Sequence, residues 1–469
     1  TGGNNTAVGK NSLDANTTAS NNTAVGHNAL GANTTGDLNT AIGVGAMTAA
    51  TTADRNVAVG KDALAAYTAD GDQYTVAIGF NAMGQTTTGG NCTAVGGGAL
   101  AANTTGGSNT AIGYFALTTN TTNGGNTAVG KSALFACASA NNTAVGAETA
   151  DALTTGAQNT AVGRYALTNT TGGSDNAVVG YNALADNVNG GQNAALGREA
   201  LKANTANSNT AIGYRSLYAN TTGTCNVAVG KDAGLTITTN SGCTLIGHGA
   251  GQANTVANIT AVGNGALYAN TTGTNNTAVG TGIYGSTQGA LGANTTGGSN
   301  TAIGSRALEA NTTASYNTAI GVNTLMAITT AETSTAVGYN VLRQTTRGGS
   351  TGVGAYTLDA NSTGNVNNGF GNNALRFNTT GSENTACGHK ALFTNTTGNE
   401  NVAVGNHAVY STTTGDRNVG IGNSALKANT TASQNTAVGY HALTANTTGA
   451  NNVAVGVWAL YSNSTGSDC

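Results

Sequence analysis

The chain contains no proline and very little charge. None of its 469 residues is proline, and only 7% are Asp, Glu, Lys or Arg. With 16 basic and 19 acidic side chains, it has too few cations to neutralise a nucleic-acid backbone, which argues against a nucleic-acid-binding protein. The absence of proline excludes collagen, and a net charge of −3 excludes a charge-driven disordered tail. No apolar run approaches the roughly 18–20 residues that span a bilayer, so we expect no membrane insertion.

Glycine is abundant instead, and it marks a tandem repeat that fills the chain. The pentapeptide Asn-Thr-Ala-Val-Gly and its close variants recur 27 times between residues 5–9 and 452–456, with most closing glycines 17 residues apart. The consensus is N-T-A-V-G-x-x-A-L-x-A-N-T-T-G-x-x, and we number its positions 1 to 17. A unit of this size cannot bury a core alone and has to stack on its neighbours.

The residue types of the repeat favour strands and turns over helices. Gly, Thr and Asn are poor in helix interiors, whereas Thr and Val favour strands and Gly and Asn favour turns. The sequence therefore predicts an all-β, parallel β-solenoid (a β-roll) of about 27 coils, continuous over residues 1–469. Each coil should carry two strands, at positions 2–4 and 8–11, which in the first coil are Thr6–Val8 and residues 12–15. About seven extra residues predict a loop or bulge near 281–291.

The columns of the repeat predict which side chains form the core. Position 4 is Val or Ile in 24 of the 27 repeats and position 9 is mostly Leu, so we expect these two columns to be the inner core. Because side chains alternate along a strand, positions 2 and 4 should share the inner face, and position 3 should face the other way. Position 3 is Ala in 22 repeats, which is too uniform for a solvated column. Either both strands of a flattened coil lie close together there, or other copies of the chain pack on it.

Position 1 predicts a hydrogen-bonded ladder. It is Asn in 21 repeats, and stacked Asn side chains can pass hydrogen bonds from amide to amide along the coils. Asn also suits the entry to a turn, where its side chain bonds local backbone. The missing proline then has a reason, because nearly every backbone N–H of a solenoid strand donates to a neighbouring coil and proline cannot donate.

The repeats, for example residues 39–43 and 435–456, resemble the N-T-A-[VI]-G-x-x-A-L-x-x-N-T-T-G arrays of tail-fibre-like proteins in phages and bacteria. They are more loosely similar to the N-S-[VT]-A-[IV]-G head repeats of YadA-like trimeric autotransporter adhesins. The resemblance covers essentially the whole chain. It implies a left-handed roll, often trimeric, that is displayed extracellularly, on the cell surface or on a virion.

This predicted architecture suggests two alternative functions. The first is a structural extracellular or virion fibre that projects or adheres, self-associates as a trimer or an end-to-end filament, and meets a cell-surface or glycan receptor. The chain begins and stops within a repeat, so we expect a segment of a longer array or filament. The second is an ice- or surface-binding protein with a flat hydroxyl array. The Thr column at position 2 exchanges with Val, which predicts that it points inward and argues against the second alternative.

No catalytic constellation stands out, so we expect no enzyme, no cofactor and no metal. Residues 125–132 fit the phosphate-loop pattern GxxxxGK[ST], but such a loop has to open a helix and here the repeat continues unchanged. His389 and His407 occupy adjacent coils and are expected to be a surface pair. Calcium-binding rolls need Asp in their glycine-rich turns, where this chain has mainly Asn and Thr.

Two kinds of covalent site are candidates. Cys225 and Cys243 are 18 residues apart, so a disulfide between adjacent coils is conceivable, whereas Cys387 at position 4 is expected to be a buried apolar residue. The Asn-Thr-Thr and Asn-Ser-Thr segments are candidate N-glycosylation sites, although Asn and Thr can simply cap the bend. Their asparagines are Asn16, Asn33, Asn103, Asn120, Asn169, Asn220, Asn270, Asn294, Asn311, Asn361, Asn378, Asn395, Asn429, Asn446 and Asn463.

Overall fold

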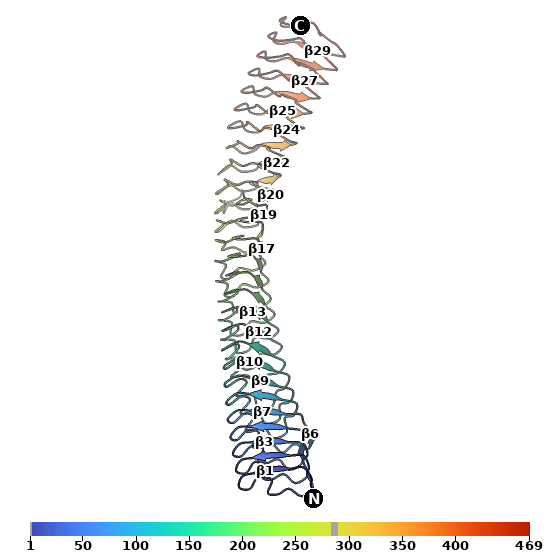
Figure 1. Cartoon of the computed structure of the whole chain (residues 1–469). Helices are drawn as coiled ribbons and strands as arrows, with labels where there is room; N and C mark the ends of the chain where they lie inside the picture. Colours follow the sequence, from blue (N-terminus) through green and yellow to red (C-terminus); the bar gives the residue numbers. More distant parts are fainter. Residues whose placement is uncertain (1, 283–288) are drawn as a thin grey trace. The chain divides into compact units, whose positions relative to one another are not determined.

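The computed structural model describes residues 2–282 and 289–469, and within them the chain is a parallel β-solenoid without helices (Figure 1). It divides into two compact units, Thr1–Asn226 and Val227–Cys469. Both units are built from the same coil of about 17 residues, which carries one three-residue strand at positions 2–4. The predicted all-β parallel solenoid of about 27 coils is confirmed. The predicted loop near 281–291 falls largely on residues 283–288, which lie outside the described residues.

Residues 2–226 of the first unit contain 13 of these strands and one additional pair. The three-residue strands are β1 (Thr6–Val8), β2 (Thr23–Val25), β3 (Thr40–Ile42), β5 (Val57–Val59), β7 (Val76–Ile78), β8 (Thr93–Val95), β9 (Thr110–Ile112), β10 (Thr127–Val129), β11 (Thr143–Val145), β12 (Thr160–Val162), β13 (Ala177–Val179), β14 (Ala194–Leu196) and β15 (Thr210–Ile212). The two-residue strands β4 (Ala53–Asp54) and β6 (Gly71–Asp72) pair with each other in parallel.

The described residues of the second unit, 227–282 and 289–469, contain 14 three-residue strands. They are β16 (Val227–Val229), β17 (Thr244–Ile246), β18 (Thr260–Val262), β19 (Thr277–Val279), β20 (Thr301–Ile303), β21 (Thr318–Ile320), β22 (Thr335–Val337), β23 (Thr351–Val353), β24 (Asn368–Phe370), β25 (Thr385–Cys387), β26 (Val402–Val404), β27 (Val419–Ile421), β28 (Thr436–Val438) and β29 (Val453–Val455).

Neighbouring strands pair in register, so equal repeat positions stack on one another. Between β2 and β3, Thr23 lies beside Thr40 and Ala24 lies beside Ala41. The longest gap in the repeat does not break this register, because Thr277 of β19 still pairs with Thr301 of β20. Each column of the repeat is therefore a continuous row of side chains along the coils of its unit.

The second strand predicted at positions 8–11 is wrong, because this segment forms consecutive turns. The physical reason is a left-handed backbone at position 9, where Leu13 and Leu30 both have φ of 48°. This conformation costs an L-residue about 1–2 kcal/mol, and full burial of the leucine offsets it by about 1.5–3 kcal/mol. The turn still bonds the next coil, since Leu13 N donates to Ala29 O at 3.1 Å. Inter-coil hydrogen bonding therefore extends beyond the strands.

The core differs from the predicted one in its strand column. Position 4 faces outward, as Ile42 (40% exposed) and Val179 (41% exposed) show. The core consists of the columns at positions 3, 8 and 9, represented by the fully buried Ala24, Ala29 and Leu30. Position 9 is therefore confirmed as core, and position 4 is corrected. The strand and the facing turn approach so closely that position 3 opposite Leu is Ala or Gly in nearly every coil, with Val178 as an exception. This supports the flattened coil and overturns an Ala-lined interface.

Two exceptions to the Ala–Leu pattern exchange volume between the columns at positions 3 and 9. Leu245 replaces Ala at position 3, and Gly251 replaces Leu at position 9, where an added Cβ would lie 2.7 Å from Leu245 Cδ2. Conversely, Gly420 at position 3 meets Val409 at position 9, whose Cγ2 would lie 2.5 Å from an added Cβ. In these two coils a change of size in one column is matched by an opposite change in the other, as close packing requires.

This compensation predicts that the effects on stability of substitutions at Gly420 and Val409 are not additive. Gly420→Ala alone should destabilise its coil by about 1–3 kcal/mol through overpacking against Val409. The double variant Val409→Leu/Gly420→Ala restores the pair found in most coils and should recover most of that loss. Hydrogen exchange of the β27 amides measures both effects, because it reports local opening. Equal losses in the single and the double variant would contradict the pairing.

A second strained position is exposed and can be relieved. Position 17 also has positive φ, and in one coil it holds the β-branched Val366 with φ of 54°. Val366→Asn should stabilise that coil by about 1 kcal/mol, since Asn tolerates this region far better. The reciprocal change Asn275→Val, at φ of 56°, should destabilise its coil by a similar amount. Local hydrogen exchange in the two coils measures both changes in stability. If both variants became more stable, or both less stable, backbone strain at position 17 would not explain the effect.

Candidate functional surfaces

The outward face of each sheet is formed by the side chains of positions 2 and 4. Position 2 is mostly half-buried Thr, and position 4 is mostly Val or Ile, with Ile112 and Ile320 exposed by 41% and 38%. None of the residues at these two positions is charged. With about 4.8 Å between strands, each unit presents parallel rows of hydroxyl and methyl groups. The prediction that the Thr column points inward is therefore wrong.

Beneath this face, the predicted Asn ladder at position 1 is confirmed. Asn384 is fully buried, and its Oδ1 accepts hydrogen bonds from the backbone N (3.0 Å) and Nδ2 (3.1 Å) of Asn401 in the next coil. Its own Nδ2 donates to Asn367 Oδ1 at 3.2 Å and to Gly398 O at 2.8 Å. Each amide thus joins adjacent coils and also bridges the interior of one coil.

A second ladder occupies position 12, where the sequence indicated turn residues or glycan acceptors. Asn378 Nδ2 donates to Asn361 Oδ1 and to Gly381 O, both at 2.8 Å. Asn395 Nδ2 continues the row by donating to Asn378 Oδ1 at 2.7 Å. In many coils the Asn at position 12 lies three residues before position 15, whose carbonyl it bonds. This constant spacing is the sequence feature that could have predicted the interior role.

The ladder places most of the candidate glycan acceptors inside the coil. Asn169 is exposed, while Asn16 and Asn463 are half-buried. Asn169 differs because it occupies position 11, and Thr170 takes the buried place at position 12. Among these candidate acceptors, Asn169 is therefore the one whose side chain is exposed. The fully buried asparagines are Asn33, Asn103, Asn120, Asn220, Asn270, Asn294, Asn311, Asn361, Asn378, Asn395, Asn429 and Asn446.

The cysteines fall into buried and exposed groups. Cys225 is exposed in the first unit and Cys243 is buried in the second, and the structure holds both as thiols. Cys387 is exposed, which corrects the prediction that it is a buried apolar residue, because position 4 faces outward. Burial raises the pKa of the thiols of Cys92 and Cys137. These two buried thiols are therefore protonated and unreactive at neutral pH.

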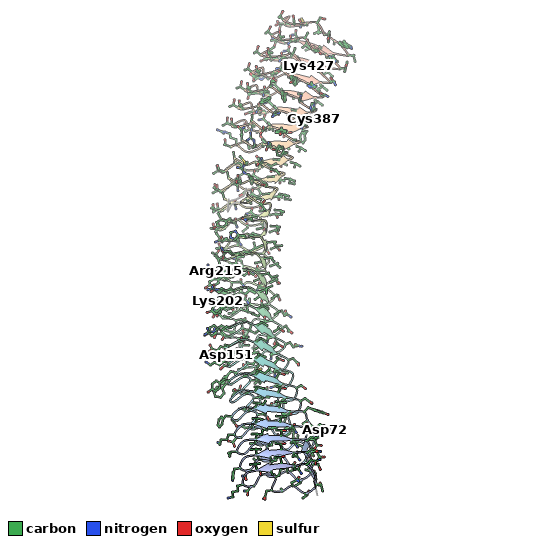
Figure 2. All side chains as sticks on the ribbon, in the orientation of Figure 1. Asp72, Asp151, Lys202, Arg215, Cys387 and Lys427 are labelled. Carbon is green, nitrogen blue, oxygen red and sulfur yellow. The ribbon has the colours of Figure 1, made fainter. Side chains whose placement is uncertain are left out.

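Positions 6, 7 and 10 form the turn edge of the coils. In the first unit, Asp151, Lys202 and Arg215 project from this edge, on the opposite side from Asp72 (Figure 2). Aromatic rings lie between the charges, and Arg215 lies 4.7 Å from the centroid of the Tyr218 ring. The edge is therefore a row of rings and charges along the coils.

In the second unit the same edge contains stacked rings and two histidines. His389 and His407 have ring centroids 5.6 Å apart, which confirms that they lie close together. Burial, followed by the charges of Lys427, His389 and Lys390, lowers the pKa of His407. Nearer the C-terminus, His441 stacks on Trp458 with centroids 4.8 Å apart. Across the described ranges, no group of three or more His, Cys, Asp or Glu could hold a metal ion.

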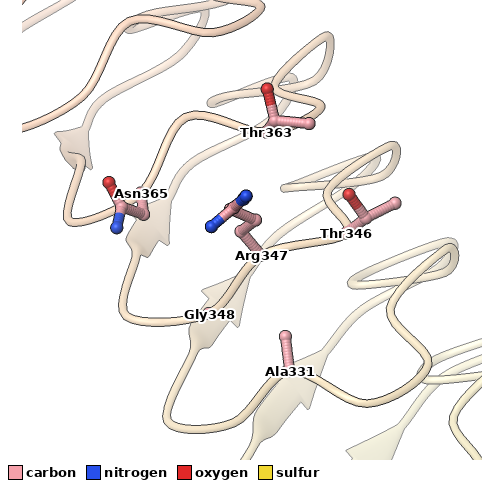
Figure 3. A pocket seen from close by; sticks show the side chains of 6 residues that line it. All are labelled: Ala331, Thr346, Arg347, Gly348, Thr363 and Asn365. Carbon is pink, nitrogen blue, oxygen red and sulfur yellow. The ribbon is translucent and has the colours of Figure 1, made fainter.

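A shallow groove of about 490 Å³ lies in the second unit. Ala331, Thr346, Arg347, Gly348, Thr363 and Asn365 line it, and the Arg347 guanidinium points toward Asn365 (Figure 3). A single exposed arginine among small polar residues does not form a catalytic arrangement. The phosphate-loop match at 125–132 likewise runs through β10, with the repeat turn and no helix after it. Within 2–282 and 289–469, no helix is long and apolar enough to cross a membrane.

The chain was compared with family models, curated proteins and solved structures. No family model, curated protein or solved structure matches the chain.

Proposed function

We propose that the chain is a structural, non-catalytic fibre protein, extracellular or carried on a virion, whose copies associate side by side through the outward sheet face. The observation that carries this proposal is the uncharged Thr and Val/Ile face, which continues from coil to coil within each unit. Large exposed apolar patches on soluble proteins mark interaction sites. The resemblance of the repeats to tail-fibre arrays and trimeric adhesin heads supports the same role.

The area of this face suits an interface. Strands of three residues are about 10 Å long, and the 14 strands of the second unit extend over about 65 Å at normal strand spacing. The resulting area of about 650 Å² approaches the roughly 800 Å² that each partner contributes to a standard protein–protein interface. One unit alone therefore provides most of the surface that a stable contact needs.

The state of assembly tests the proposal. The native chain should form dimers or trimers in light scattering coupled to size-exclusion chromatography. The double variant Ile303→Lys/Ile320→Lys puts two charges on the outward face, where both side chains are already 38% exposed, and should give monomers. Thr397→Lys, at an exposed turn, is the matched control and should leave assembly unchanged. A native chain that stays monomeric at all accessible concentrations would refute lateral association.

The same face favours a second candidate, an ice- or surface-binding protein. The observation is the outward Thr column, which places hydroxyls at the regular spacing of the strands. A thermal hysteresis assay separates the two functions. Hysteresis in a monomeric native chain, lost in Ile303→Lys/Ile320→Lys, would support ice binding, and assembly without hysteresis would support the fibre.

A further inference from the structure

The turn edge of residues 371–461 carries cations but no carboxylates. Its cations are Arg376, Lys390 and Lys427, and no Asp or Glu occupies positions 6, 7 or 10 in these coils. Within the described part of the chain, none of the three cations forms an ion pair. The acidic residues of these coils lie at positions 16 and 17, as Glu383 and Glu400 do, before the strand rather than after it. The edge therefore carries unneutralised positive charge.

Aromatic rings at positions 10 and 11 accompany Arg376 and Lys390 and form a row over three coils. The ring centroids of Phe377 and Phe393 are 5.0 Å apart, and those of Phe393 and Tyr410 are 5.2 Å apart and nearly parallel. Arg376 lies 5.3 Å from the Phe377 ring centroid, and Lys390 lies 5.5 Å from that of Phe393. The packed rings and cations hold one another in place, so this surface is ordered before any ligand arrives. Pre-ordering lowers the entropy lost on binding.

We propose that this basic aromatic edge, formed by Arg376, Phe377, Lys390, Phe393, Tyr410 and Lys427, binds an acidic polysaccharide that runs along the coils. The apolar C–H faces of sugar rings pack on aromatic side chains, and the carboxylates of the polymer pair with the Lys and Arg head groups. Rings occupy three consecutive coils, at Phe377, Phe393 and Tyr410, and the cations occupy three of four consecutive coils, so both are spaced along the coils as the sugar units and charges of such a polymer are. This role goes beyond that of the fibre and uses a different surface of the same coil.

The arrangement fits a sugar polymer better than a nucleic acid. Rings that already pack edge-to-face and face-to-face on each other leave no gap in which a nucleobase could stack between them. Three cations would also neutralise few phosphates, whereas nucleic-acid affinity depends mainly on phosphate contacts. An acidic polysaccharide requires fewer charges because part of the contact is made by sugar C–H groups.

The first unit offers an internal control. Its turn edge also carries cations, but carboxylates on the same edge neutralise several of them. Lys61 Nζ lies 3.0 Å from Asp62 Oδ2, and Lys131 Nζ lies 3.5 Å from Glu148 Oε1. An acidic polymer would have to displace these partners, so we expect weaker binding around Lys61 and Lys131 than at the edge of residues 371–461.

Binding of the full-length chain to alginate, a polymer of uronic acids, tests this proposal by biolayer interferometry. Neutral dextran and single-stranded DNA serve as competitors, and no step requires the chain to assemble. Arg376→Gln/Lys390→Gln should weaken alginate binding at least tenfold, and Phe393→Ala should weaken it severalfold. Lys61→Gln/Lys131→Gln, which removes two cations from the first unit, should leave binding unchanged. Raised salt should weaken binding of the native chain, because the contact is partly ionic.

Three outcomes would overturn the proposal. They are undiminished alginate binding by Arg376→Gln/Lys390→Gln, equal binding of dextran and alginate, and tighter binding of DNA than of alginate. Light scattering on the same samples reports assembly separately. Failure of polysaccharide binding is therefore distinguishable from failure of the fibre proposal.

Discussion

Gly388→Ala is expected to separate two neighbouring coils of the second unit. Gly388 closes the pentapeptide at position 5 with φ of +141°, a conformation that L-residues rarely adopt. An added Cβ would lie 2.4 Å from the carbonyl oxygen of Gly405 in the next coil. Backbone strain and overpacking together should cost roughly 3–5 kcal/mol, because a neighbouring backbone cannot move aside as a side chain can.

Local hydrogen exchange of β25 and β26 measures this loss, because coils of a solenoid open in part rather than all at once. Gly97→Ala is the matched control, since an added Cβ there meets only the Tyr114 ring, at 3.5 Å, and Gly97 has no positive φ. We expect fast hydrogen exchange around Gly388→Ala and near-native exchange around Gly97→Ala. Equal protection in the two variants would show that position 5 tolerates a side chain.

Asn384→Leu should have an effect of similar size through the buried ladder. The change keeps the approximate side-chain volume but removes four hydrogen bonds, two accepted from Asn401 and two donated to Asn367 and Gly398. At about 1 kcal/mol for each lost bond, with an added penalty for the orphaned Asn401 amide, the loss should be about 4 kcal/mol. Asn372→Leu, at an exposed turn position, should change stability little.

Asn384→Asp makes the same ladder sensitive to pH. One carboxyl oxygen could still accept from Asn401, but the other would face the carbonyl of Gly398 and the Oδ1 of Asn367. An ionised carboxylate is repelled there, so its pKa in the folded chain should lie above that of the unfolded chain. Its protonated form can donate, so the coil should be most stable at acidic pH and lose stability as the pH rises through the raised pKa. Exchange protection that improves with rising pH, after correction for intrinsic exchange rates, would contradict this assignment.

The solenoid could be predicted well from the sequence, because the same 17-residue pattern recurs along the whole chain. The recurring Thr-Ala-Val segment placed β1 at Thr6–Val8, as observed, and the Asn column predicted the first ladder. Side-chain alternation correctly paired position 2 with position 4, but it does not say which of the two faces is buried. The Ala column at position 3 indicated burial only weakly. The Val column at position 4 indicated burial strongly, but it faces outward. As a result, the wrong face of the sheet was predicted to be buried. The Thr column and Cys387 were therefore expected to point inward, whereas both point outward.

Two further features lay outside what propensity can predict. Leucine rarely adopts a left-handed backbone, so nothing in the residue type at position 9 indicated the turns that replace the second strand. The buried role of Asn378 was hidden because Asn-Thr-Thr is also a common turn sequence. In both cases packing inside the coil overrides the local preference.

Native-state thiol labelling tests the orientation of the coil most directly. The chain supplies its own probes, since Cys387 lies on the outward face while Cys92 and Cys137 lie inside. In the Ile303→Lys/Ile320→Lys variant, which is designed to prevent the proposed lateral association, a maleimide reagent should modify Cys387 about as fast as the exposed Cys225 and Cys469. Cys92 and Cys137 should react only after unfolding. Protection of Cys387 together with rapid labelling of Cys92 and Cys137 would show that the Val column points inward and would contradict the account.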